Sequence, residues 1–103
     1  MQFFTDLDRF IDGLDVLLID TAAGISSNVM DFVVMAHEII VVVSPEPTSI
    51  TDAYALMKVL SLRYAEKSCR LLVNMVTSPR EAQDVFRQLG LVTDRFLDIH
   101  IEY

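Results

Sequence analysis

This sequence has few cysteines and glycines and no long apolar run. Its single cysteine, Cys69, allows no disulfide framework and no metal-ligand spacing, and indicates a reduced, cytoplasmic compartment. The three glycines, at positions 13, 24 and 90, include no Gly-x-x-x-x-Gly-Lys-Ser/Thr sequence, so this chain has no phosphate-binding P-loop. No apolar run approaches the roughly 18–20 residues of a membrane-spanning helix. The first residues also lack the basic region followed by an apolar one that marks a secretion signal.

Positive charge is also scarce. Eight lysines and arginines stand against 15 acidic residues, and the resulting net charge of −7 argues against nucleic acid as a direct partner. Apolar residues, in contrast, make up 52% of the 103 residues, and the mean hydropathy is +0.41. A chain of this length forms one domain at most. We therefore expect the excess of apolar residues to lie in a buried sheet, or on surface normally covered by something missing from this chain.

One apolar run organises the first half of the sequence. Residues 16–19 (VLLI) are followed at once by Asp20, and this pattern predicts a strand over residues 15–21 that is buried on both faces of a parallel sheet. Asp20 would then lie at the carboxyl end of the strand, where open α/β sheets bind ligands. An aspartate there can hold Mg2+ through water beside a phosphate, and the small residues that follow let the backbone approach. The alternative is that Asp20 only caps the next helix or closes a turn.

Three further strands and four helices are predicted from apolar periodicity and capping signals. The other strands are expected at residues 39–43, 69–76 and 98–103. A short helix from Thr5 should end at Gly13, and a second helix should cover about residues 27–36. A capping box from Ser49 to Asp52 opens the next helix. The last begins at Ser78, is interrupted or ended by Gly90, and continues in further turns over residues 91–97. Strands separated by helices predict right-handed parallel crossovers.

Three stretches at predicted strand ends resemble the MinD/ParA family of deviant-Walker ATPases. Residues 17–26 (LLIDTAAGIS) and 44–56 (SPEPTSITDAYAL) are most similar to its FlhG/FleN (YlxH) branch, which controls flagellar number and placement. Residues 72–76 (LVNMV) resemble the strand whose asparagine contacts adenine. The resemblance runs from about Asp12 to Tyr103. The 44–56 stretch is specific to the branch, whereas the Asp-Thr-x-Ala-Gly pattern is shared across the wider family.

This resemblance implies a three-layer α/β fold with a parallel sheet of the P-loop NTPase (SIMIBI, MinD-like) type. Residues 1–103 would form a single partial domain of about four strands, the second half of the ATPase domain. ATP and Mg2+ are expected as cofactors of the intact parent. The chain itself lacks the P-loop, switch I, the last sheet segment and the C-terminal amphipathic helix used for membrane attachment. It is therefore expected neither to bind ATP tightly nor to hydrolyse it alone.

The resemblance also implies roles for individual residues. Asp20 corresponds to the switch II carboxylate, which reaches Mg2+ through water and helps to position the attacking water. Asn74 resembles the adenine reader, although a turn residue that satisfies backbone groups is the simpler reading of an asparagine here. Glu46 is similar in place to residues near the subunit interface. The switch II loop that senses the γ-phosphate corresponds to Thr21, Ala22, Ala23 and Gly24.

Partners and competing functions follow from the same residues. The parent is expected to bind a flagellar or polar-positioning partner, and to reach the inner face of the membrane through segments absent here. An amidoligase relative, such as cobyrinic acid a,c-diamide synthase or dethiobiotin synthetase, shares the fold, although residues 45–49 (PEPTS) argue against it. A receiver module would need an earlier acidic pair and a late Lys-Pro, neither of which is present; a non-catalytic interaction domain is the remaining alternative.

The chain alone should self-associate as a dimer or higher oligomer. In the family it resembles, the P-loop strand lies between the strands that correspond to residues 15–21 and 39–43, and this sequence lacks that strand.

Overall fold

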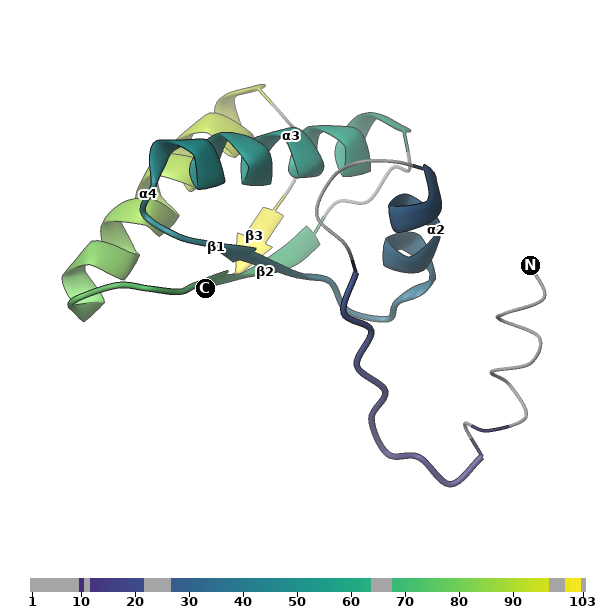
Figure 1. The fold of residues 1–103 in the computed structure, drawn as a ribbon. Helices are drawn as coiled ribbons and strands as arrows, with labels where there is room; N and C mark the ends of the chain where they lie inside the picture. Colours follow the sequence, from purple (N-terminus) through teal and green to yellow (C-terminus); the bar gives the residue numbers. More distant parts are fainter. Residues whose placement is uncertain (1–9, 11, 22–26, 64–67, 97–99, 103) are drawn as a thin grey trace.

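The computed structural model describes residues 10, 12–21, 27–63, 68–96 and 100–102, and shows an α/β protein in which helices alternate with parallel strands (Figure 1). The alternation confirms the α/β class predicted from the apolar runs. In chain order the elements are α2 (Ser27–Met35), β1 (Ile40–Val43), α3 (Pro47–Arg63), β2 (Ser68–Val73), α4 (Pro79–Phe96) and β3 (His100–Glu102). None of the described helices is both long enough and apolar enough to cross a membrane.

The strands form one parallel sheet in the order β1-β2-β3. Ile40 lies opposite Arg70 and Val43 opposite Val73, while Ser68 lies opposite His100. Each new strand is therefore added beside the previous one, on the same side. Successive crossovers of one hand that progress in one direction place their helices on the same face of the sheet.

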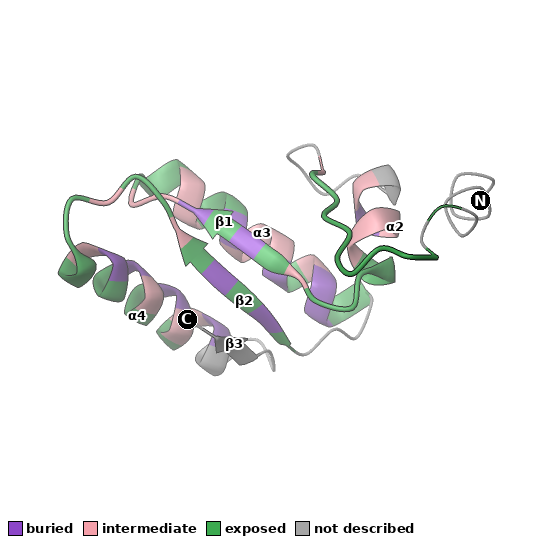
Figure 2. Cartoon of the chain, turned by 90° about the horizontal axis from the view of Figure 1, so that it is seen from below, coloured by how far each residue is buried: buried purple, intermediate pink, exposed green. Residues whose placement is uncertain are grey.

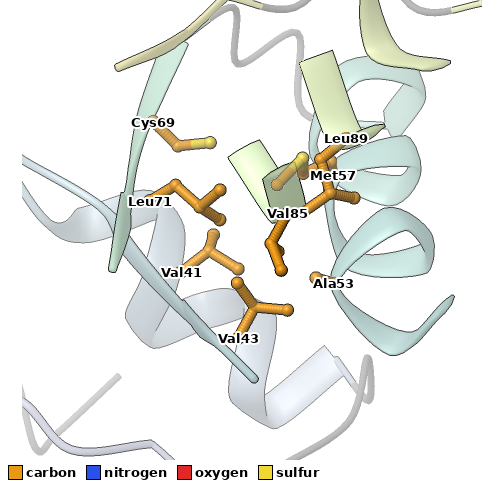
Figure 3. Packing of buried hydrophobic residues seen from close by; sticks show 8 residues of the cluster. All are labelled: Val41, Val43, Ala53, Met57, Cys69, Leu71, Val85 and Leu89. Carbon is orange, nitrogen blue, oxygen red and sulfur yellow. The ribbon is translucent and has the colours of Figure 1, made fainter. Parts of the chain in front are cut away.

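Helices α3 and α4 both cover that one face, and the core lies between them and the sheet (Figure 3). Side chains alternate along the strands as expected for a pleated sheet. In β2, Cys69 and Leu71 point inward and are buried, whereas Arg70 and Leu72 are exposed. The buried cluster consists of Val41, Val43, Ala53, Met57, Cys69, Leu71, Val85 and Leu89.

The opposite face of the sheet is bare in the described part of the chain (Figure 2). Ile40, Val42 and Leu72 remain 54–59% exposed on it. Parallel sheets are ordinarily covered by helices on both faces, because their strands are apolar on both sides. The expected three-layer arrangement is therefore wrong for the described residues: they form two layers, one of strands and one of helices.

The predicted strand over residues 15–21 is not formed. Residues 15–20 are exposed, with Val16 at 74% and Leu18 at 84%, Thr21 is half-buried, and the segment belongs to no described sheet. A strand is stabilised by the backbone of a neighbour, and nothing in the described residues pairs with this run. The described residues form a sheet of three strands where about four were expected, and the outer edge of β1 has no neighbour among the described strands.

Three helix boundaries test the capping signals. Helix α3 begins at Pro47, so the capping box predicted from Ser49 to Asp52 lies inside the helix. Helix α4 begins at Pro79 after Ser78, as predicted, and continues through Gly90 without interruption. Glycine costs about 1 kcal/mol within a helix, and here the buried residues on either side, Leu89 and Thr93, hold the helix against the core. The helix predicted from Thr5 lies outside the described residues; Gly13, its predicted end, has a φ of 103°.

Candidate functional site

The carboxyl ends of β1 and β2 lie side by side, and each strand passes into a helix through a short polar loop. Val43 and Val73 are register partners, and the backbone N–H of Asn74 donates to the Val43 carbonyl at 2.8 Å. This bond continues the ladder by one step beyond the strands. It places Asn74 next to the loop that begins at Ser44, at the edge of the sheet where ligands bind in open α/β folds.

The first loop is tied to the helix that follows it. The backbone N–H of Ser44 donates to Ser49 Oγ at 2.9 Å, across the start of α3. Glu46 precedes the first helical residue, and its carbonyl accepts the first helical bond, from the Ile50 N–H at 3.1 Å. Proline at the first helical position loses nothing, because its missing N–H would have had no helical partner. Ser49, predicted as a cap, therefore closes the loop, and the Glu46 side chain is left exposed.

The second loop holds Asn74 and an unusual backbone conformation. The Asn74 side chain is exposed at the sheet edge, and Met75 has a φ of 59°. A left-handed conformation in a residue other than glycine or asparagine costs on the order of 1–3 kcal/mol. No local pattern in the sequence signals it, since methionine has no preference for this region. The conformation lies between the end of β2 and the start of α4.

The start of α4 completes this loop. Ser78 Oγ accepts from the Glu81 N–H at 3.2 Å, and Thr77 Oγ1 donates to the Glu81 carboxylate at 2.7 Å. The predicted pairing of Ser78 with Glu81 is thus present, although the carboxylate reaches Thr77. Two helix starts, those of α3 and α4, therefore face the same edge of the sheet as Asn74 (Figure 1).

Asp20 does not join this group. The segment of residues 12–21 lies on the α2 side of the sheet, away from the carboxyl ends of β1 and β2 (Figures 1 and 2). Asp20 is exposed and Thr21 is half-buried, whereas Ala22, Ala23 and Gly24 lie outside the described residues. Among the described residues, no three His, Cys, Asp or Glu side chains gather as a metal site. The described residues thus do not bring the candidate metal carboxylate, Asp20, and the candidate adenine reader, Asn74, to one site.

Comparisons with known proteins show which curated proteins the chain is similar to. No family model matches it. It is 50% identical, over all 103 of its residues, to the "Antiactivator FleN" of Pseudomonas aeruginosa, of which the match covers 36%. It is 34% identical over 86 residues, 84% of its length, to the "Flagellum site-determining protein YlxH" of Helicobacter pylori, of which the match covers 29%. The chain thus spans about a third of the length of these relatives.

Proposed function

Because this chain is close in sequence to the FlhG/FleN branch of the MinD/ParA family, we propose that it is part of a longer ATP-binding protein that regulates flagellar number or placement. The observation that carries the proposal is the identity with FleN at half of all positions, along the entire chain. A similarity confined to the apolar runs would reflect only a shared sheet. A similarity that extends beyond the apolar runs, into loops and exposed helix faces, points to a shared role.

Within that longer protein, the edge formed by the ends of β1 and β2 would be the base-binding side of the nucleotide site. Asn74 supports this assignment because its backbone is held by the Val43 carbonyl while its side chain is left exposed. A carboxamide offers a donor and an acceptor in one plane, as the N6 and N7 edge of adenine requires. Asp20 would hold Mg2+ through water, and Thr21, Ala22, Ala23 and Gly24 would form the loop beside the γ-phosphate. This requires residues 15–21 to join the sheet.

The remaining assignments concern partners. Glu46, exposed before α3, is proposed to lie near the interface between two ATP-bound subunits. The longer protein would be cytoplasmic and would reach the inner membrane face and a flagellar or polar partner through segments outside these residues. The net charge of −7 favours a protein partner over nucleic acid.

The chain alone should bind ATP weakly or not at all. In related folds the P-loop supplies most of the phosphate contacts and a neutralising lysine, and this sequence has neither. Isothermal titration of the 103-residue chain with ATP and Mg2+ should give no saturable heat up to millimolar ligand. A micromolar dissociation constant would contradict the proposal that the nucleotide site is shared with other segments.

The residue roles are separable in the longer protein. Asp20→Asn should abolish ATP hydrolysis and leave ATP binding nearly unchanged, because the carboxylate acts on the metal and on water. Asn74→Ala should instead weaken ATP binding and reduce the preference for ATP over GTP. Lys58→Ala, on the exposed side of α3 and away from its start, is a control that should change neither. Equal loss of binding and turnover in Asp20→Asn would show that Asp20 is structural.

A further inference from the structure

Met75, the residue after the candidate adenine reader, departs from the pattern of the strand that leads to it. Along β2 every second side chain lies in the core: Cys69 and Leu71 are 4% and 5% exposed, and Val73 packs against the same cluster. Continued by two residues, this alternation would carry Met75 onto the helix-covered face. Its side chain is instead 74% exposed, so it lies outside the core that the strand builds.

The backbone conformation of Met75 accompanies this exposure. Its φ of 59° is the only positive value at a residue other than glycine in the described part of the chain. A left-handed residue breaks the alternation of a strand, and methionine, unlike glycine, pays a steric cost for it. Strained residues persist where the surrounding structure imposes the conformation, and they cluster at ligand sites. Burial of the side chain does not explain the strain here, so its reason lies at the surface.

The loop that carries Met75 is anchored on both sides. Before it, the Asn74 N–H donates to the Val43 carbonyl at 2.8 Å and fixes the backbone at the carboxyl end of the sheet. After it, Thr77 Oγ1 donates to the Glu81 carboxylate at 2.7 Å and ties the loop to the first turn of α4. Met75 is therefore held, with its side chain exposed, at the edge where open α/β sheets bind ligands.

We propose that Met75 is a second base-binding residue of the nucleotide site, whose side chain makes the apolar contact with the purine ring while Asn74 hydrogen-bonds with its edge. This inference rests on the nucleotide-binding function proposed above. Methionine suits the contact, because its thioether is polarisable and its unbranched side chain adapts to an aromatic surface. An exposed carboxamide and an exposed apolar side chain in adjacent residues offer the two kinds of contact that a purine can accept.

The two contacts differ in what they recognise. Hydrogen bonds from Asn74 distinguish adenine from guanine, since the groups at the edge of the ring differ between the two bases. An apolar contact with the ring does not depend on those groups. Met75 should therefore contribute to the affinity for either purine nucleotide, and not to the choice between them.

Isothermal titration of the longer protein tests this division of roles. Met75→Ala and Met75→Gly should each raise the dissociation constants of ATP and of GTP by roughly 3- to 10-fold, which leaves their ratio unchanged. Met75→Leu keeps an apolar side chain of similar volume and should stay within about 2-fold of the parent. Met35→Ala is the matched control, since Met35 is 59% exposed at the end of α2, and it should change neither constant.

Two further measurements separate a base contact from a change in the loop. Inorganic triphosphate has no base, so its affinity should be the same in all the Met75 variants. Met75→Gly removes the side chain but adopts the φ of 59° without strain, so its thermal midpoint should not fall below that of the parent. Parent affinity for ATP in Met75→Gly would overturn the proposal. So would a loss of triphosphate affinity as large as the loss of ATP affinity.

Asn74→Ala shows which of the two proposals fails. If Asn74→Ala weakens ATP binding and the Met75 variants do not, the edge still binds the base and only the role of Met75 is wrong. If neither residue affects ATP binding, the edge is not the base-binding side, and both proposals are wrong.

Discussion

Two apolar runs of nearly the same composition end in different structures in this molecule. Residues 16–19 and residues 40–43 each consist of four aliphatic side chains in sequence. The second run is β1, with Val41 and Val43 at most 3% exposed; the first is an extended segment with Leu18 at 84%. The β-branched content is higher in residues 40–43, but the larger difference is that β2 lies alongside them and that α3 packs on them.

The comparison shows that an apolar run indicates a strand only where a neighbour is available. Pairing with β2 satisfies the backbone groups on one side of β1, and the buried Val41 and Val43 add the packing that an isolated strand lacks. Residues 16–19 pair with no described strand, and their side chains are 39–84% exposed. Any change that supplies or removes a neighbour should therefore move one run towards the behaviour of the other.

The two regions should differ most in stability when one leucine in each is truncated to alanine. Leu71→Ala, in the core beside β1, should lower the free energy of unfolding by about 2–5 kcal/mol. Leu18→Ala should change it by less than about 0.5 kcal/mol when the chain is dilute enough to be monomeric. Urea denaturation followed by circular dichroism measures both. Comparable losses would mean that residues 16–19 are packed within one copy.

A smaller effect should come from the cap that starts α4. Ser78→Ala removes the acceptor of the Glu81 N–H and should cost about 1 kcal/mol. Ser78→Thr keeps a hydroxyl and should recover most of that loss. The same urea experiment applies, and an unchanged midpoint in Ser78→Ala would show that packing alone places this helix. The result separates local from tertiary stabilisation within the packed region.

The smallest effect, and the only stabilising one, is expected at the turn after β2. Met75→Gly removes the side chain that disfavours the φ of 59°, but it also gives the unfolded chain more freedom. The net gain should be at most about 1 kcal/mol, seen as a rise in the thermal midpoint. Met75 is 74% exposed, so no core contact is lost. A clear loss of stability would mean that its side chain is packed in solution, as in an interface.

Local signals in the sequence were reliable where local physics decides. The alternation of helices and strands, the strand at residues 40–43 and the start of α4 at Pro79 follow from apolar periodicity and from Ser78. The resemblance of residues 17–26 and 44–56 to the FlhG/FleN branch is confirmed by the similarity to FleN and YlxH. The start of α3 was predicted three residues late, because Ser49 has the form of a cap, whereas Glu46 occupies the cap position and Pro47 is the first helical residue.

The candidate site was predictable residue by residue but not as an assembly. Asn74 and the loop from Ser44 meet at one edge because parallel strands end together, as the pattern predicts. Whether Asp20 reaches that edge depends on whether residues 15–21 have a strand to pair with, which their own sequence does not specify.

The sequence by itself therefore determined which segments are helical or apolar, where Ser78 and Pro79 start a helix, and which family the chain resembles. These properties depend on spacing, capping and proline chemistry within a few residues. Only the tertiary structure decided that no described element covers one face of the sheet, that residues 16–19 pair with no described strand, and that Met75 adopts a left-handed conformation. These depend on contacts between distant residues, because burial and strand pairing are properties of neighbours and not of a run alone.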